Sequence, residues 1–350
     1  MRKFILSAIS ISCISLYSLD CAAQTAAPIE YRDAVLGTDC VWMATGHGLV
    51  RYDKQTGTSE TFSSDKYSDI TALALSSDGS LFVGCGKGEG VASFADGEFS
   101  QIAQPEEPLQ NVSAMLYSNG LWVGSSQYLN LHDGNNWESW QCPYPMSSYC
   151  QFDALAYDDS SATLWFGING NTLDKKLGSV TSEGEISYID KATYDIYDIC
   201  VPEPGKLLLA TEDGMYQYMD GGLSMLEHPI SSIPKKCNVV TSQDNTIWFA
   251  AGNTLVRGTG YSYRAFECKT DNDADYITSI LPDGDVIWVT LAYGGLYRFT
   301  GDSFEQASGV DAVIPETELH DGDVYFLDGT VNRTPRKGEV YVRNGKKVIA

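Results

Sequence analysis

Basic residues are scarce in this chain of 350 residues. Lys and Arg number 23 against 46 Asp and Glu, which gives a formal net charge of −23. Binding to the phosphates of DNA or RNA needs clustered cations, so this balance excludes nucleic acid as the expected partner. It disfavours an anionic membrane surface for the same reason. Hydrophobic residues still make up 43% of the chain, so the protein is expected to fold rather than remain disordered.

The sequence also lacks the familiar enzyme and metal-site motifs. It has no GxSxG elbow, P-loop, dinucleotide fingerprint or CxxC pair. None of its four histidines has the HExxH spacing of a zinc site: His47, His132, His228 and His320. A pair of catalytic carboxylates for glycoside hydrolysis stays an open possibility, but with 46 acidic residues in the chain the sequence identifies no particular pair. These absences favour a noncatalytic protein.

A long apolar run occurs only at the N-terminus. Residues 1–3 are Met-Arg-Lys, residues 4–19 are mostly apolar with interspersed serines, and small residues precede a cut after Ala23. This pattern predicts a signal peptide over residues 1–23 and export to the periplasm or the extracellular space. The mature chain would then have no membrane span. Lipoprotein anchoring at Cys21 is an alternative, although Asp20 before it fits a lipobox poorly.

Seven cysteines remain if cleavage follows Ala23. An exported chain meets oxidising conditions, in which cysteine pairs form. Cys142 and Cys150 are the disulfide candidate, because they bracket a short loop. The odd number leaves at least one thiol unpaired. The alternative is that most of these cysteines are small buried residues.

A repeat of about 40 residues is the strongest signal in the sequence. In each unit an apolar strand that ends in small residues carries a bulky anchor, and five of the seven Trp occupy this position. The anchors fall at residues 42, 82, 122, 165, 208, 248, 288 and 325. An earlier strand and a tight turn precede the anchor, and two further strands follow it. No convincing amphipathic helix pattern is present.

Four short antiparallel strands per unit predict an all-β fold, a β-propeller with four-stranded antiparallel blades. Stacking the blades in a ring buries faces that one sheet alone would expose, and the Trp anchors are expected to fill the layers between blades. Eight units favour eight blades. Seven is the alternative, because the last unit has Tyr325 as its anchor and an irregular connection over residues 330–338. No linker divides the chain, so residues 24–350 are predicted to form a single domain.

The unit resembles the two-component regulator propeller repeat, with the best matches over residues 41–53 and 287–299. That repeat builds the periplasmic sensor domains of bacterial hybrid histidine kinases. The resemblance implies a secreted or periplasmic, sensor-like propeller that binds glycans or proteins. The sequence contains no kinase or DNA-binding module that would transmit a signal.

Ligands of propellers usually bind at one end of the channel, on the loops between the second and third strands and between blades. The repeat register predicts these ligand-binding residues: His47, Lys87, Gln127, Tyr128, Asn169, Glu212, Asn253 and Tyr293. Amides and aromatic faces suit sugars, whereas the alternative is that these residues only form turns. We therefore predict a monomeric, noncatalytic propeller that binds a glycan or an envelope or extracellular protein. The runner-up is a carbohydrate-active enzyme, a polysaccharide lyase or glycoside hydrolase, on the same scaffold.

Calcium is the only cofactor that the sequence suggests. Asp271, Asp273 and Asp275 alternate as do the first oxygen ligands of a calcium loop. Tyr276 stands where an EF-hand has Gly, and Pro282 stands where it has Glu, so the segment is not an EF-hand. A solvated acidic loop is the simpler interpretation.

Overall fold

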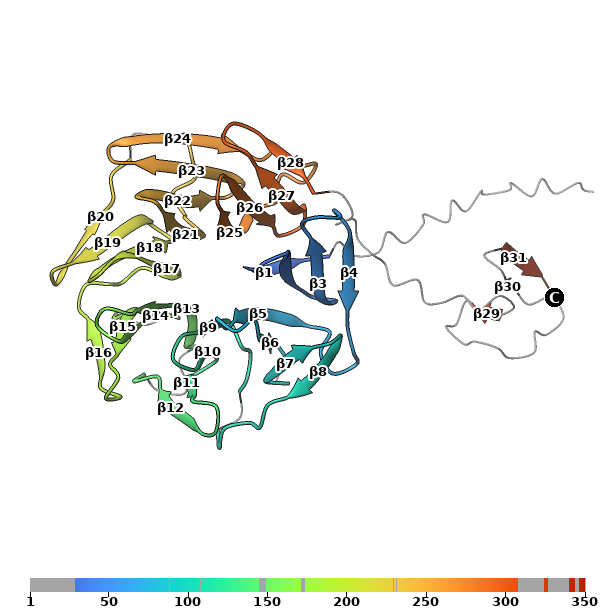
Figure 1. Ribbon diagram of the computed structural model, residues 1–350, viewed down its shortest axis with the longest axis horizontal. Helices are drawn as coiled ribbons and strands as arrows, with labels where there is room; N and C mark the ends of the chain where they lie inside the picture. Colours follow the sequence, from blue (N-terminus) through green and yellow to red (C-terminus); the bar gives the residue numbers. More distant parts are fainter. Residues whose placement is uncertain are drawn as a thin grey trace, which may run out of the picture.

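Seven four-stranded antiparallel sheets form a closed ring around a central axis (Figure 1). The structure is a computed structural model that describes residues 29–307, apart from residues 88, 108, 145–148, 171–173, 229 and 231. It also describes the backbone of three C-terminal strands. The predicted signal peptide and Cys21 lie outside the described residues. The part of the chain that the structure describes contains no helix able to span a membrane.

Each blade consists of four consecutive strands, which run in order from the axis to the rim. The first three blades are built from β1 (Tyr31–Leu36), β2 (Cys40–Thr45), β3 (Gly48–Asp53), β4 (Ser59–Phe62), β5 (Ile70–Leu75), β6 (Leu81–Cys85), β7 (Val91–Ala95), β8 (Glu98–Gln101), β9 (Ala114–Tyr117), β10 (Leu121–Gly124), β11 (Tyr128–His132) and β12 (Trp137–Gln141). The next two are built from β13 (Gln151–Asp158), β14 (Thr163–Asn169), β15 (Leu177–Val180), β16 (Ile186–Ile189), β17 (Ile196–Glu203), β18 (Lys206–Thr211), β19 (Gly214–Met219) and β20 (Gly222–Met225).

The last two blades are built from β21 (Val239–Gln243), β22 (Thr246–Ala251), β23 (Thr254–Thr259), β24 (Ser262–Glu267), β25 (Ile277–Asp283), β26 (Val286–Leu291), β27 (Gly295–Phe299) and β28 (Phe304–Gln306). A separate three-stranded sheet is formed by β29 (Val324–Phe326), β30 (Val340–Arg343) and β31 (Lys346–Ile349). The predicted all-β propeller of four-stranded blades is therefore confirmed.

The anchor residues pack between blades. Trp248 on β22 is 7% exposed and lies in a cluster with Ile280 and Phe299 of the next blade. Trp122 on β10 packs in the same way against Phe152 and Leu164. The flat indoles fill the layer between two twisted sheets, which neither sheet could bury alone.

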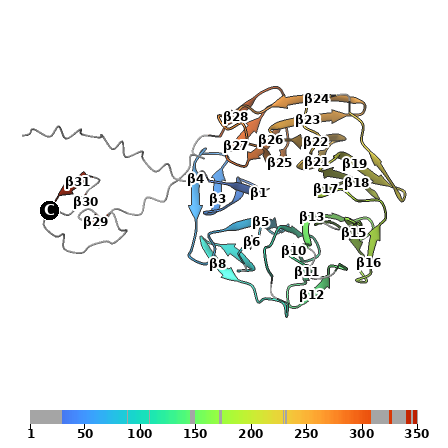
Figure 2. The same cartoon turned by 180° about the vertical axis from the view of Figure 1, so that it is seen from behind.

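The ring closes between the seventh and first blades, and the two blades share no strand (Figure 2). The N–H of Tyr31 donates to the carbonyl oxygen of Ala292 at 2.7 Å. Trp288 on β26 is buried in one cluster with Met43 and Tyr52 of the first blade. Side-chain packing, this backbone hydrogen bond and an ion pair between Lys54 and Asp283 at 3.0 Å therefore close the circle.

The preference for eight blades was wrong. Because the seventh blade packs directly against the first, no place remains for an eighth sheet between them. Among the described residues of the last sequence unit, β29 to β31 form a sheet of their own and join no sheet of the ring.

Candidate functional site

One end of the ring carries both the turns between second and third strands and the connections that enter each blade. The first strand of a blade runs antiparallel to the second, so that Tyr31 at the start of β1 pairs with Thr45 at the end of β2. We call this end the loop face. Most of the sequence-predicted ligand contacts lie on it.

Each of five inner strands has a β-bulge near the loop face, and the bulge takes one residue of the strand out of the hydrogen-bonded ladder. Equivalent residues precede β9 and β21 in the two remaining blades. Together they form what we call the channel ring, one residue from each blade: Arg32, Thr71, Ser113, Asp153, Tyr197, Asn238 and Thr278. All seven line one cavity of about 360 Å³ on the axis. Bulges often lie beside functional sites because they re-aim a side chain, so this ring marks the candidate site.

Some members of the ring connect neighbouring blades. Thr71 donates its hydroxyl proton to a carbonyl oxygen of the third blade at 2.6 Å, and Ser113 donates to Phe152 O of the fourth at 2.8 Å. These hydroxyls are committed to protein acceptors. They fix the geometry of the channel rather than leaving a donor for a ligand.

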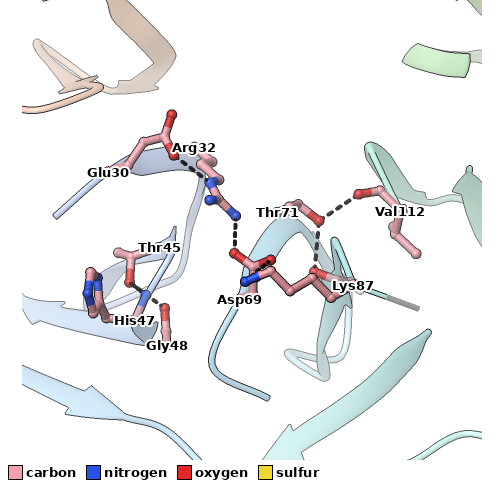
Figure 3. Close-up of polar contacts among 10 residues, drawn as sticks. Glu30, Arg32, Thr45, His47, Gly48, Asp69, Thr71, Lys87 and Val112 are labelled. Atoms are coloured by element: carbon pink, nitrogen blue, oxygen red, sulfur yellow. Dashed lines mark hydrogen bonds and ion pairs between the residues drawn. The ribbon is translucent and has the colours of Figure 1, made fainter. Parts of the chain in front are cut away.

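Arg32 lies in a network of two cations and two carboxylates (Figure 3). Its Nε donates to Glu30 Oε2 at 3.0 Å and its Nη1 to Asp69 Oδ1 at 2.6 Å. Lys87 Nζ lies 3.5 Å from the other Asp69 oxygen. The network joins the first two blades and is formally neutral.

A pocket of about 290 Å³ opens at the mouth of the channel, on the side of the fifth, sixth, seventh and first blades. We call it the mouth pocket. Its polar and aromatic lining residues are Arg32, Tyr197, Lys236, Asn238, Tyr276 and Thr278. Lys236 Nζ lies 4.0 Å above the ring of Tyr197, a cation–π contact. Lys236 forms no ion pair with any residue that the structure describes. This pocket therefore combines an unpaired cation, an amide and two aromatic rings.

The phenols of the mouth pocket stay protonated at neutral pH. Burial, with the negative charges of Asp195 and Glu212, raises the pKa of Tyr197. Burial, with the charge of Glu30, raises the pKa of Tyr276. Both hydroxyls can thus donate a hydrogen bond to a ligand.

Two partly buried aspartates, Asp33 and Asp198, link neighbouring blades below the mouth. One oxygen of Asp33 accepts the N–H of Ala34, and the other accepts the N–H of Leu73 in the second blade, each at 2.8 Å. In the same way, one oxygen of Asp198 accepts the N–H of Ile199, and the other accepts the N–H of Val240 in the sixth blade, each at 2.9 Å. Burial raises the pKa of Asp33 to about 6 against these bonds. Burial, together with the charge of Asp33, raises the pKa of Asp198 to about 7.

We expect these two carboxyls to make the protein less stable at pH 8 than at pH 5. A folded-state pKa above the ordinary value of 3.8 means that the contribution is full below about pH 4 and is lost as pH rises through 6 and 7. The loss between pH 5 and pH 8 should be on the order of 3 kcal/mol. Thermal melts in a chelating buffer measure it. The double variant Asp33→Asn, Asp198→Asn should flatten the profile, and an unchanged profile would refute the assignment.

Three sequence-predicted residues lie on exposed turns of the loop face. His47 is exposed, its N–H donates to Thr45 Oγ1 at 3.1 Å, and its ring lies to one side of the Arg32 network (Figure 3). Lys87 belongs to that network. Glu212 Oε1 accepts the N–H of Asp195 at 3.2 Å. A direct ligand contact by these residues remains a prediction.

The two predicted asparagines are bonded to the protein. Asn169 is 5% exposed, and its amide contacts Asp153 Oδ2 at 2.9 Å and both backbone groups of Ile196 at 2.7 and 2.8 Å. Asn253 Nδ2 donates to Cys268 O at 3.1 Å. Asn169 thus joins two blades and orients a channel-ring carboxylate, a role that turn chemistry did not suggest.

Gln127 and Tyr128 lie beside a disulfide. The structure joins Cys142 and Cys150, and the backbone of Gln127 is bonded to both, accepting from Cys142 N at 2.8 Å and donating to Cys150 O at 3.0 Å. Tyr128 is the first residue of β11 and pairs with Gln141. The other five described cysteines are free and mostly buried: Cys40, Cys85, Cys200, Cys237 and Cys268.

Tyr293 and the acidic segment meet in the seventh blade. Asp275 is 5% exposed, and its Oδ1 accepts the N–H groups of Tyr276 at 3.0 Å and Tyr293 at 2.9 Å. Asp271 and Asp273 are exposed. Asp275 therefore shapes the loop that presents two tyrosines, and calcium binding by the segment stays a prediction.

Sequence reasoning missed the channel ring, although a signal for it exists. A polar residue recurs about every 40 residues just inside or before the first strand of each unit. Strand alternation hides it, because a bulge places this residue outside the regular period of two.

No protein-family model matches the sequence, and no curated protein matches it either. Many solved structures share the fold. Virginiamycin B lyase from Staphylococcus aureus, in a catalytically inactive form with quinupristin, is 13% identical with a TM-score of 0.67, over 79% of this chain and 96% of the lyase. YCF48 bound to a D1 peptide is 14% identical with a TM-score of 0.56, over 79% and 93%.

Two structures of the extracellular domain of BT4673 from B. thetaiotaomicron, described in one case as a one component system and in the other as a hybrid two component system, have TM-scores of 0.52. They are 16% and 14% identical over 77% and 91% of this chain, which spans 45% and 59% of their length. A lyase, a protein bound to a peptide and the extracellular domain of BT4673 thus have a similar fold. At such identities the likeness establishes that the chain is a β-propeller and leaves its ligand open.

Proposed function

We propose that this protein is an exported, noncatalytic binding protein that takes up a glycan in its mouth pocket. The observation that carries the proposal is the composition of that pocket. Tyr197 and Tyr276 offer aromatic faces and hydroxyl donors, Asn238 offers an amide, and Lys236 offers an ammonium group without an ion-pair partner.

These groups suit the chemistry of sugars. A pyranose ring presents C–H faces that pack on aromatic rings and hydroxyls that bond to amides and phenols. Tyr149, Tyr194 and Tyr293 are also exposed and come from turns or blade connections of the loop face, so further sugar units would meet more aromatic surface. The site is built on inner strands and blade-to-blade clamps, which favours a preformed pocket.

Export agrees with this function. The leader pattern of the sequence and the Cys142–Cys150 disulfide both fit an oxidising compartment, where polysaccharides are accessible. A monomer suffices, because the mouth pocket is formed by one chain.

Thermal melts against a panel of oligosaccharides test the proposal. A ligand that binds only the folded state at a hundredfold excess over Kd stabilises it by about 2.7 kcal/mol. With the saccharide that raises the Tm most, we expect Tyr276→Ala and Lys236→Ala each to weaken binding roughly tenfold, the effect of losing about 1.4 kcal/mol.

Tyr261→Ala is the matched control, because Tyr261 is fully exposed on a hairpin of the sixth blade and should not change affinity. If no oligosaccharide raises the Tm, a glycan ligand is rejected. Pull-down of an envelope protein whose binding depends on Tyr276 would then identify a protein ligand instead. Release of sugar product by the unmodified protein would instead favour the lyase or hydrolase alternative.

A further inference from the structure

Another pocket lies at the end of the ring opposite the loop face, between the third and fourth blades. Its lining comes from the turns that precede β10, β14 and β16 and from the strands β10, β11, β12 and β13. We call it the far pocket. Its volume of about 210 Å³ is below the roughly 300–1,000 Å³ of pockets for drug-sized ligands, so it suits a smaller guest.

Two hydrogen bonds between the blades hold the far pocket in shape. Asn119 Nδ2 donates to Tyr157 Oη at 3.1 Å, and Trp140 Nε1 donates to Gly184 O at 3.2 Å. All four residues line the pocket. Because each bond joins the third blade to the fourth, the two walls are fixed relative to each other and the pocket is preformed.

Aromatic side chains make up much of this lining. The rings of Trp122 and Trp140 stack with their centroids 5.6 Å apart and their planes at 24°, and Tyr157 adds a third ring. Both indole N–H groups already donate to carbonyl oxygens, so they offer no donor to a ligand. The faces of aromatic rings attract cations through the ring quadrupole, and an indole does so most strongly.

A carboxylate without a partner cation completes the far pocket. Glu138 on β12 lines it and forms no ion pair with any residue that the structure describes. A methyl group at Gly184 would lie 3.2 Å from Glu138 Oε1 and 3.8 Å from a ring carbon of Trp140, so the carboxylate and the indole approach the same turn. None of the described lining residues is basic.

We propose that the far pocket binds a small quaternary ammonium compound, with its cationic group at the indoles of Trp122 and Trp140 and beside the Glu138 carboxylate. Three aromatic rings and one carboxylate are the groups that recognise such cations. The net charge of −23 also favours a cationic ligand, because it raises the concentration of cations near the surface.

The lining distinguishes between kinds of cation. A quaternary ammonium group has no N–H to satisfy, whereas a primary ammonium group would bury N–H donors against aromatic carbon. A metal ion is disfavoured, because the described residues contain no group of three His, Cys, Asp or Glu placed to hold one. A free cation is favoured over a phospholipid headgroup, because no basic lining residue would neutralise the phosphate.

Calorimetric titration of the unmodified protein with choline chloride at constant ionic strength, without saccharide, tests the inference. We expect one site per chain. The neutral isostere of choline, in which carbon replaces nitrogen, should bind at least tenfold more weakly, and ethanolamine and phosphocholine should also bind more weakly than choline. Glu138→Gln keeps the shape of the side chain and should weaken choline binding roughly fivefold. Glu185→Gln is the matched control, because Glu185 is exposed at the start of the strand that follows the same turn and does not line the pocket.

NMR spectra of the indole N–H groups locate the ligand without any variant. Choline should shift the resonances of Trp122 and Trp140 and leave those of Trp248 and Trp288, which lie in other blades, in place. The inference fails if choline does not bind at millimolar concentration, if the neutral isostere binds as tightly, if Glu138→Gln leaves affinity unchanged, or if only other indoles respond. Because the far pocket and the mouth pocket share no residue, failure here leaves the proposed glycan function untouched.

Discussion

Replacing Trp288 with alanine is expected to destabilise the protein by about 3–5 kcal/mol, the usual effect of removing a buried indole. Trp288 is 5% exposed at the contact between the seventh and first blades, with its ring 5.5 Å from that of Tyr52. Its Nε1 donates to Asp283 Oδ2 at 3.1 Å, and the same oxygen accepts from Lys54 Nζ at 3.0 Å. The substitution removes packing and one member of a bridge between two blades.

The loss should lie toward the upper end of this range, because the seventh and first blades, unlike the other neighbouring blades, are not consecutive in the chain and no loop ties them together. Chemical denaturation measured by tryptophan fluorescence and circular dichroism gives the free energy of unfolding. Tyr261→Ala, at a fully exposed position, should stay within about 0.5 kcal/mol of the unmodified protein. A loss below about 1 kcal/mol for Trp288→Ala would show that side-chain packing does not hold the ring closed.

Asn169→Ala should destabilise the protein by about 2–4 kcal/mol. The variant leaves the buried N–H and carbonyl of Ile196 without partners, and each unsatisfied buried group costs about 1–3 kcal/mol. It also removes a hydrogen bond that lowers the pKa of Asp153, so this carboxyl should titrate at higher pH. Denaturation curves measure the first effect, and NMR titration of the Asp153 carboxyl measures the second.

Asn253→Ala is the matched control. Asn253 is partly exposed, and its amide makes one bond, to Cys268 O, so we expect a loss of only about 0.5–1.5 kcal/mol. If the two variants lose the same stability, Asn169 is an ordinary turn residue and not a link between blades.

The repeat predicted the architecture because the same local chemistry recurs in every unit. A tight turn, a bulky anchor and small residues after it specify one hairpin, and each hairpin needs a neighbour to cover its faces. The anchors at Trp122, Trp248 and Trp288 accordingly lie between blades. The number of blades was less predictable, since the last unit keeps its apolar strand in the sequence while its described strands, β29 to β31, form a separate sheet.

The candidate site was predicted only in part, for a geometric reason. Turn residues such as His47 and Glu212 can be placed from the hairpin register, and they lie on the loop face. Arg32, Tyr197 and Asp153 point into the channel because bulges shift them, and a sequence without an alignment shows no bulge.

The sequence by itself therefore determined the blade, its four strands, its packing anchors and the end of the ring on which loops gather. Those features depend on contacts within one unit or between adjacent units, which the repeat encodes directly. Only the tertiary structure decided that seven blades close the circle and that Lys236, Tyr276 and Arg32 share one pocket. Ring closure brings residues more than 240 positions apart in the sequence into contact. This contact follows from the combined geometry of all seven blades and not from any local pattern.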